Sequence, residues 1–154
     1  MDTSTPYAAL PVRVTWENTD TAGYVHNSIV FRWFEQAELE WFRALDIHWK
    51  SFPEYGFPRV HVEARFLRPL HFDDLCELRT VVGQVRAASY TLRHEVHKGG
   101  RLAVRGQVTV CCVAVGDGKP RVLPERMGAV LQGLCHAPQF AGPPALPASQ
   151  PPVY

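Results

Sequence analysis

The sequence lacks a long apolar run and any concentration of one charge, and each gap excludes a class of protein. No window approaches the roughly 18 consecutive apolar residues that cross a bilayer, so we expect no membrane span. The 16 basic and 15 acidic residues leave a net charge of +1, and the basic residues are scattered singly. A nucleic-acid interface needs a basic stripe instead. We therefore expect neither a membrane nor a nucleic acid as partner.

Cysteine is scarce as well, with four residues. Cys111 and Cys112 are neighbours in an alternating apolar run, so their side chains are expected on opposite faces of a strand. No two cysteines have the two-residue spacer that is typical of zinc sites. The first ten residues lack the basic and apolar regions of a secretory leader. We expect reduced thiols, no metal and a cytoplasmic location.

What the sequence does contain fits one globular domain. Its 154 residues are 46% hydrophobic and 11% aromatic, which is enough to bury a full core. Six of the 13 prolines fall within residues 136–154, where they would interrupt any helix or sheet ladder. The sequence therefore predicts a domain over residues 1–135, folded from about residue 8, and a proline-rich, disordered tail over 136–154.

One segment, residues 28–45, has the period of an α-helix. At 100° per residue, its apolar side chains gather in an arc of about 120° that is unusually rich in aromatics, including Trp33 and Trp41. Such a face is wider than a surface helix needs, which predicts the central helix of the domain. Asn27 or Ser28 is the expected N-cap, because a short polar side chain accepts from the free amides of the first turn.

The remaining segments predict strands. They are residues 12–16, 60–66, 75–85, 89–97 and 102–115, followed by a closing helix over 124–134. Val60 and Val62 share one apolar face in the second strand, and Tyr90, Leu92 and His94 share one in the fourth. The short connections after residues 85 and 97 favour antiparallel hairpins. This order predicts an α+β fold, a sheet curled around a helix, with edge strands that would pair with a second copy.

The segment that could carry chemistry lies between the first strand and the helix. Asp20, Gly23 and the start of the helix at Asn27 fall within eight residues. A carboxylate beside backbone amides that can stabilise an oxyanion is the minimal equipment for acyl transfer. An aspartate that only closes an Asx-turn is the structural alternative.

The same residues resemble a known family. The run 20–27, followed by Phe31 to Glu35, is similar to the Asp-x-x-Gly-x-Val signature and helix of the hotdog-fold acyl-CoA thioesterases, in the 4-hydroxybenzoyl-CoA thioesterase branch. Residues 66–74, 89–96 and 120–124 resemble its later strands and closing segment, so the likeness covers about residues 11–134. It implies an antiparallel sheet wrapped around a central long helix. It also implies a homodimer or homotetramer that hydrolyses an acyl- or aroyl-coenzyme A without a cofactor.

The resemblance assigns roles within the motif. Asp20 matches the catalytic carboxylate, which in the family either attacks the thioester carbonyl or activates a water. The backbone N–H of Asn27 matches the amide that polarises the carbonyl. Gly23 would let the chain turn close to the substrate. His26 would either orient the carbonyl or a water, or merely fill the turn.

Coenzyme A in the family binds at the subunit interface, with basic side chains on its phosphates. Arg86 matches one such position, but Ala87 and Ala88 stand where relatives often carry more basic residues. Arg126 is a second candidate, and both arginines are equally compatible with a solvated surface. Trp33 is a candidate for the acyl pocket, although an aromatic on the buried face of a helix is usually a core residue.

Other arrangements remain as alternatives. Glu38 lies at the edge of the helix's apolar arc and is a second candidate base, whereas Glu35 is expected to face away. His94 and His97 would point to opposite faces of a strand, which excludes a shared metal. A module that binds acyl-CoA without hydrolysis, a scaffold, or a thioesterase acting on acyl carrier protein would also fit. A hydratase would need a paired histidine and acid in another motif, which the sequence lacks.

Overall fold

The structure, a computed structural model, describes residues 8–135 of the 154. The predicted tail over 136–154 lies outside the described residues. In chain order the elements are β1 (Ala8–Arg13), η1 (Trp16–Asn18), α1 (Asn27–Ala44), η2 (Trp49–Ser51), β2 (Tyr55–Gly56), β3 (Arg59–Phe66), β4 (Leu75–Arg86), β5 (Ser89–Lys98), β6 (Arg101–Cys111), β7 (Val113–Ala114) and α2 (Glu125–Cys135).

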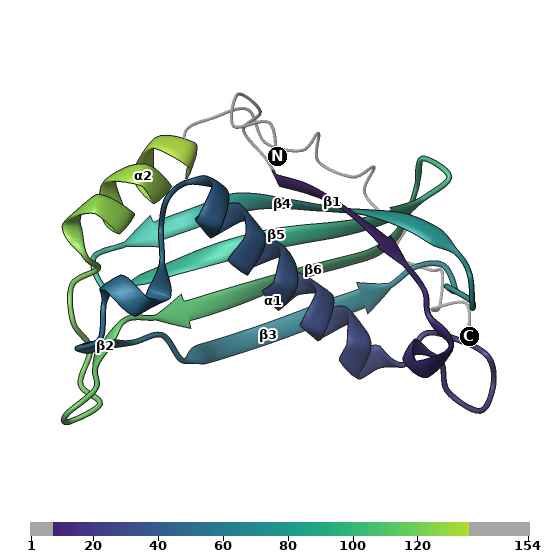
Figure 1. The fold of residues 1–154 in the computed structure, drawn as a ribbon, viewed down its shortest axis with the longest axis horizontal. Coiled ribbons are helices and arrows are strands. Elements are labelled where there is room, and N and C mark those ends of the chain that lie inside the picture. Colours follow the sequence, from purple (N-terminus) through teal and green to yellow (C-terminus); the bar gives the residue numbers. More distant parts are fainter. Residues whose placement is uncertain (1–7, 136–154) are drawn as a thin grey trace, which may run out of the picture.

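Five strands form one antiparallel sheet in the order β1-β4-β5-β6-β3. Strands β4, β5 and β6 follow one another through tight hairpins, which confirms the predicted meander. Helix α1 lies diagonally across one face of this sheet, and β2 and β7 form a separate small ribbon (Figure 1). The α+β prediction is therefore confirmed.

Two predicted strands were placed or ended wrongly. The first covers Ala8–Arg13 instead of 12–16, because η1 begins at Trp16. There the side chain of Asn18 accepts from the backbone N–H of Thr15, and local bonds of this kind compete with a sheet ladder. The last long strand ends at Cys111, and the following Val113–Ala114 pairs with β2 instead of continuing the main sheet.

The core lies between α1 and the inner face of the sheet. The aromatic face of α1 is buried as predicted, including Trp33 and Phe34. On the sheet side, Tyr90, Leu92 and His94 of β5 are each 1% exposed or less, which confirms the predicted apolar face of that strand. Fully burying each large apolar side chain contributes about 1.5–3 kcal/mol to folding. This shared burial fixes the position of α1 relative to the strands.

Strand β3, at one edge of the sheet, forms where the sequence predicts a strand, but its apolar residues are not all covered. Val60 and Val62, which share the predicted apolar face, are 61% and 48% exposed. The strand is an outer one, and its register to β6 shifts between Arg59 and His61. One apolar side of β3 therefore stays open to solvent in the single chain.

Gly106 allows α1 to come close to the sheet. A Cβ at this position would lie 2.5 Å from the ring of Phe34 and 2.5 Å from the carbonyl oxygen of Glu63. The Phe34 ring also stacks on His94, the β5 partner of Gly106, with ring centroids 4.3 Å apart. Only a residue without a side chain leaves room for this ring.

We therefore expect Gly106→Ala to lower the free energy of unfolding by about 1–3 kcal/mol, because the added methyl overpacks the core. Denaturant unfolding measures the change. Gly133→Ala in α2 is the matched control, since a Cβ added at Gly133 would have no atom within 4 Å. Alanine also has a higher helix propensity than glycine. An unchanged midpoint in Gly106→Ala would contradict this packing.

His94 is buried as a neutral ring. Its Nδ1 lies 2.9 Å from the hydroxyl of Thr80, and burial lowers the pKa of His94 from 6.5 to about 3. Between these two values the unfolded chain binds one more proton than the folded chain. The free energy of unfolding therefore falls as the pH drops from about 6.5 toward 3.

His94→Gln is expected to lose this part of the acid sensitivity. The slope of the free energy of unfolding against pH should fall by up to about 1.4 kcal/mol per pH unit. The measurement is denaturant unfolding between about pH 4 and pH 6.5, in steps of about half a pH unit. His61→Gln, at an exposed histidine of β3, should keep the wild-type slope. Equal slopes in wild type and His94→Gln would show that His94 is not buried as a neutral ring.

Candidate functional site

The predicted catalytic segment forms a tight turn between η1 and α1. The backbone N–H of Asp20 donates to the carbonyl oxygen of Tyr24 at 2.8 Å, and that of Gly23 donates to the carbonyl oxygen of Asp20 at 3.0 Å. Gly23 has a φ of +80°, a conformation that favours glycine. The sequence places a glycine where this turn requires one.

The Asp20 carboxylate is exposed and held by one of its oxygens. Oδ1 accepts from the backbone N–H of Ala22 at 2.8 Å and from that of Tyr24 at 3.3 Å. Among the described residues, no group bonds to the other oxygen, Oδ2. The Asx-turn interpretation is thus correct for Oδ1, and it leaves Oδ2 open to a ligand.

The turn is fixed to its surroundings on two sides. The backbone N–H of Val25 donates to the carbonyl oxygen of Leu70 at 2.8 Å, and that of His26 donates to the carbonyl oxygen of Asn18 at 2.9 Å. The rings of Tyr24 and His71 lie 5.1 Å apart. These contacts fix the backbone of the turn that carries Asp20 and leads into α1.

Helix α1 begins at Asn27 with His26 as its N-cap. The Nδ1 atom of His26 accepts from the backbone N–H of Ser28 at 3.3 Å and lies 2.8 Å from the Ser28 hydroxyl. The predicted caps, Asn27 and Ser28, are therefore wrong, because an imidazole nitrogen takes the place of the expected side-chain oxygen. If Nδ1 accepts in the neutral ring, the proton is on Nε2.

The backbone N–H of Asn27 is available to a ligand. The first amides of a helix have no partner within the helix, and no acceptor for this one lies among residues 8–135. The helix dipole also favours negative charge at this position. The turn from Asp20 through Gly23 and His26 to Asn27, which leads into α1, is the Asp20 junction.

The other predicted site residues lie elsewhere in the single chain. In Figure 1, α1 begins at one end of the molecule, while α2 and the C-terminal end of β4 lie at the other. Arg86 is the exposed last residue of β4, and Arg126 of α2 forms an ion pair with Asp46. Trp33 is 6% exposed within the core. Within the single chain, Arg86 and Arg126 therefore lie at the opposite end of the molecule from the start of α1.

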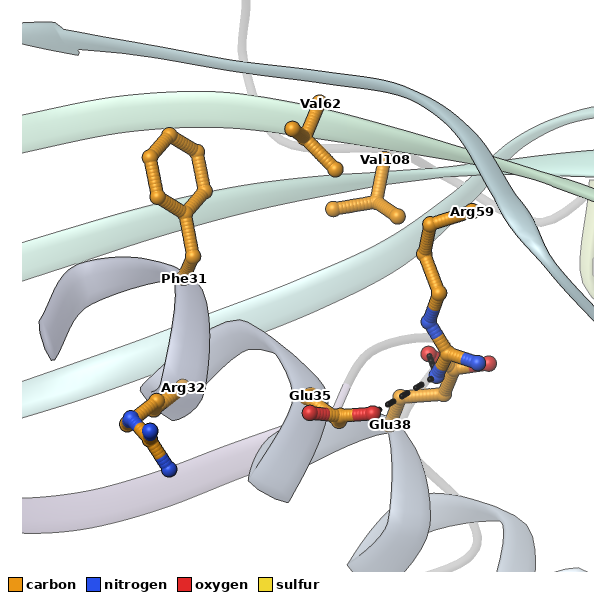
Figure 2. Close-up of a pocket in the computed structure, with 7 residues that line it drawn as sticks. All are labelled: Phe31, Arg32, Glu35, Glu38, Arg59, Val62 and Val108. Atoms are coloured by element: carbon orange, nitrogen blue, oxygen red, sulfur yellow. Dashed lines mark hydrogen bonds and ion pairs between the residues drawn. The ribbon is translucent and has the colours of Figure 1, made fainter. Parts of the chain in front are cut away.

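Further along α1, a buried carboxylate lies beside a pocket (Figure 2). Glu38 is 1% exposed, its Oε2 lies 2.7 Å from Nη2 of Arg59, and its Oε1 accepts from the hydroxyl of Tyr90 at 2.5 Å. Burial raises the pKa of Glu38, and the positive charge of Arg59 opposes this shift. Both oxygens are occupied, so the geometry favours Asp20 over Glu38 as the reactive carboxylate.

The pocket beside Glu38 has a volume of about 350 Å³. It lies between α1, β3 and β6, and its lining residues are Phe31, Arg32, Glu35, Glu38, Arg59, Val62 and Val108. Glu35, which was expected to face away from the domain, is 57% exposed at its side chain but turns toward Arg59 at 3.6 Å. The attraction to this cation brings Glu35 to the pocket.

Sequence reasoning missed Arg59 and Tyr90. Tyr90 had been assigned to an apolar core face, and Arg59 stands 21 residues from Glu38 in the chain. The only signal in the sequence was the position of Glu38 at the edge of the apolar face of the helix. A carboxylate that becomes buried there requires a partner.

Within the described part of the chain, no three His, Cys, Asp or Glu side chains are grouped as metal ligands. His94 is buried against Phe34, whereas His97 bonds to Glu95, so the two histidines are not joined in one site. None of the described helices is long and apolar enough to cross a membrane.

Comparison with known proteins identifies the family. Residues 14–131 match the family model described as the Thioesterase-like superfamily. The chain is 26% identical over 129 residues to the acyl-CoA thioesterase YbgC of Haemophilus influenzae, covering 82% of this chain and 95% of the relative. It is 27% identical over 122 residues to the acyl-CoA thioester hydrolase YbgC of Escherichia coli O157:H7, covering 77% and 91%.

The fold is also found among solved structures. Slr0204, a 1,4-dihydroxy-2-naphthoyl-CoA thioesterase from Synechocystis, superimposes with a TM-score of 0.79 at 20% identity. The alignment covers 85% of this chain and 99% of that one. The expected hotdog fold is thereby confirmed.

The cap at His26 predicts a stability effect. His26→Ala removes the acceptor of the Ser28 amide and should lower the free energy of unfolding by about 1 kcal/mol, as measured by denaturant unfolding. His26→Asn supplies another N-cap acceptor and should recover most of this loss. If Ala and Asn were equally stable at this position, His26 would not be acting as a cap.

Proposed function

The chain belongs to the thioesterase-like superfamily, and from this premise we propose that it hydrolyses the thioester bond of an acyl-coenzyme A, with Asp20 as the catalytic carboxylate. The observation that carries the proposal is the junction at the start of α1. There, an exposed carboxylate with one free oxygen lies in the turn that leads into α1, and the first backbone amide of that helix, at Asn27, has no partner among the described residues. The 26% identity to a named acyl-CoA thioesterase supports coenzyme A as the carrier of the acyl group.

The amide of Asn27 would bind the oxygen of the thioester carbonyl. In the tetrahedral intermediate this oxygen carries a full negative charge, which an N–H donor and the helix dipole stabilise more than they stabilise the neutral carbonyl. Differential binding of this kind lowers the barrier of the reaction. Breaking the carbon–sulfur bond then releases coenzyme A as its thiol.

Asp20 can supply the attack by two routes. As a general base, Oδ2 takes a proton from water while the water oxygen bonds to the carbonyl carbon, and the proton passes to the leaving thiolate. As a nucleophile, Oδ2 bonds to the carbonyl carbon, and water then hydrolyses the resulting anhydride. Both routes give one carboxylic acid and one thiol. One turnover in oxygen-18 water distinguishes them, because the nucleophilic route leaves the label on Asp20 when water attacks its carboxyl carbon.

Three further residues have supporting roles in the proposal. Gly23 keeps the backbone of the turn close to the substrate through its positive φ. His26 fixes the first turn of α1, and its Nε2–H would orient the carbonyl or a water. Trp33 is buried in the core and would line the inner side of the site that binds the acyl group.

The active form would be at least a homodimer, or a homotetramer built from two dimers. The exposed Val60 and Val62 follow the open edge of β3, where a second copy could extend the sheet. Two-fold pairing along this edge reverses one copy relative to the other. The end of one copy that carries Arg86 and Arg126 would then lie toward the Asp20 end of its partner, where both could reach the phosphates of coenzyme A.

We place this activity in the cytoplasm. Cys76, Cys111 and Cys112 are thiols in the described part of the chain, and Cys76 and Cys112 are buried. A reducing compartment keeps thiols in this state.

Asp20→Asn is expected to lower kcat by roughly a hundredfold or more, because an amide can neither accept the proton of water nor attack the carbonyl. The measurement is thiol release from a panel of short, medium, long and aromatic acyl-CoA substrates. Glu17→Gln, an exposed carboxylate one turn earlier in the chain, is the matched control and should keep wild-type activity.

An active Asp20→Asn variant would remove Asp20 from the mechanism. Binding of acyl-CoA by the wild type without thiol release would instead indicate a non-hydrolytic module. If the chain hydrolysed only acyl groups attached to acyl carrier protein, that protein and not coenzyme A would be the carrier of the substrate.

A further inference from the structure

The face of α1 that begins at the Asp20 junction continues into the pocket beside Glu38. Asn27, Phe31, Glu35 and Glu38 follow one another at intervals of four, four and three residues, which places them on one side of a helix. The last three line the 350 Å³ pocket. A chain bound with its carbonyl at the Asn27 amide could therefore extend along α1 into this pocket.

The pocket has apolar walls and a polar end. Figure 2 shows Phe31, Val62 and Val108 on one side, whereas Arg59 reaches toward Glu38 and Glu35 on the other. The apolar walls suit a hydrocarbon chain. The polar end would leave a plain methyl terminus beside charged groups, which lose solvation without gaining a hydrogen bond.

Arg59 is a fixed donor at that end. Its Nη2 lies 2.7 Å from Glu38 Oε2, and its Nη1 donates to the carbonyl oxygen of Phe57 at 3.1 Å. Tyr90 in turn holds Glu38 from the core side. A guanidinium has five N–H donors, more than these partners use, and the Arg59 side chain is 27% exposed.

The charges around the pocket select for an uncharged oxygen. Arg32 and Arg59 balance Glu35 and Glu38, so the lining has no net charge when all four are ionised. The carboxylates of Glu38 and Glu35 already lie 2.7 and 3.6 Å from the Arg59 guanidinium. A ligand carboxylate at Arg59 would be repelled by both of them. A hydroxyl can accept from Arg59 and donate to Glu35, so it satisfies both partners.

The distance along α1 sets the length of the acyl chain. Glu38 is the eleventh residue after Asn27, which corresponds to about 16 Å at the helical rise of about 1.5 Å per residue. A medium-length chain of about the size of a dodecanoyl group spans such a distance. A short acyl group would end before it reached Arg59.

We infer that this pocket binds the far end of a medium-length acyl group that carries a hydroxyl, and that Arg59 is the residue that selects for this hydroxyl. The inference rests on the proposed hydrolysis at Asp20 and specifies its substrate class. It assigns Glu38 and Tyr90 to positioning Arg59.

Three matched substrates test the inference: dodecanoyl-, ω-hydroxydodecanoyl- and dodecanedioyl-coenzyme A. For the wild-type chain we expect kcat/KM to be about tenfold higher for the hydroxylated substrate than for dodecanoyl-CoA, the size of effect given by a hydrogen bond to a charged group. The dicarboxylic substrate should show no such gain.

The variant must remove Arg59 without leaving a buried charge unpaired. Arg59→Met combined with Glu38→Met and Tyr90→Phe replaces the whole polar group by apolar side chains, which is often tolerated where removal of one partner is not. The tenfold preference should fall to about one. Arg65→Met is the matched control, since Arg65 is an exposed arginine of the same strand outside the pocket lining, and it should keep the preference.

A second measurement does not require turnover or a change at Arg59. Calorimetry with Asp20→Asn compares the Kd values of the three thioesters, and the hydroxylated one should bind about tenfold more tightly than dodecanoyl-CoA. Equal affinity and equal kcat/KM for these two would overturn the inference and leave the hydrolysis at Asp20 intact. A preference for the dicarboxylic substrate would also overturn it. Tighter binding of the hydroxylated thioester, together with no thiol release by the wild-type chain, would support the pocket and contradict the proposed function.

Discussion

Helix α1 carries an apolar face too wide for a surface helix, and only a sheet that curls around it can cover that face. The close approach that this requires is visible at Gly106, where the Phe34 ring occupies the space of a missing side chain. Once α1 is fixed in this way, both ends of the stripe from Asn27 to Glu38 are fixed too. The start of the helix lies at the Asp20 turn, and Glu38 reaches Arg59 and Tyr90 about three turns later.

The two carboxylates near α1 differ in what surrounds them. Asp20 is exposed and keeps one oxygen open, whereas Glu38 is buried with both oxygens engaged. Burial without a partner would cost several kcal/mol, so Glu38 keeps its place only together with Arg59 and Tyr90. Our proposal that Asp20 carries the reaction rests on this difference, as does the proposal that Glu38 orients a neighbouring cation. The difference follows from solvent access and hydrogen bonding, since both groups are carboxylates.

Local patterns in the sequence were sufficient for the helix, the hairpins and the Asp20 turn, because each depends on residues close together in the chain. The glycine at position 23 and the period of α1 are examples. Two features could not be predicted in this way. The pairing of Glu38 with Arg59 joins residues of two elements, and the exposure of Val60 depends on β3 being an edge strand. The sequence made His26 a candidate site residue, but its role as a cap required the geometry of its ring.

The central claim is that one stripe of α1 positions the whole acyl group, from its carbonyl at Asn27 to its far end at Arg59. A crystal structure of Asp20→Asn with ω-hydroxydodecanoyl-CoA bound tests it most directly. We predict the thioester oxygen within hydrogen-bond distance of the Asn27 backbone N–H, the hydrocarbon chain beside Phe31, and the hydroxyl at the Arg59 guanidinium. A thioester bound away from the start of α1, with the pocket empty, would contradict the account.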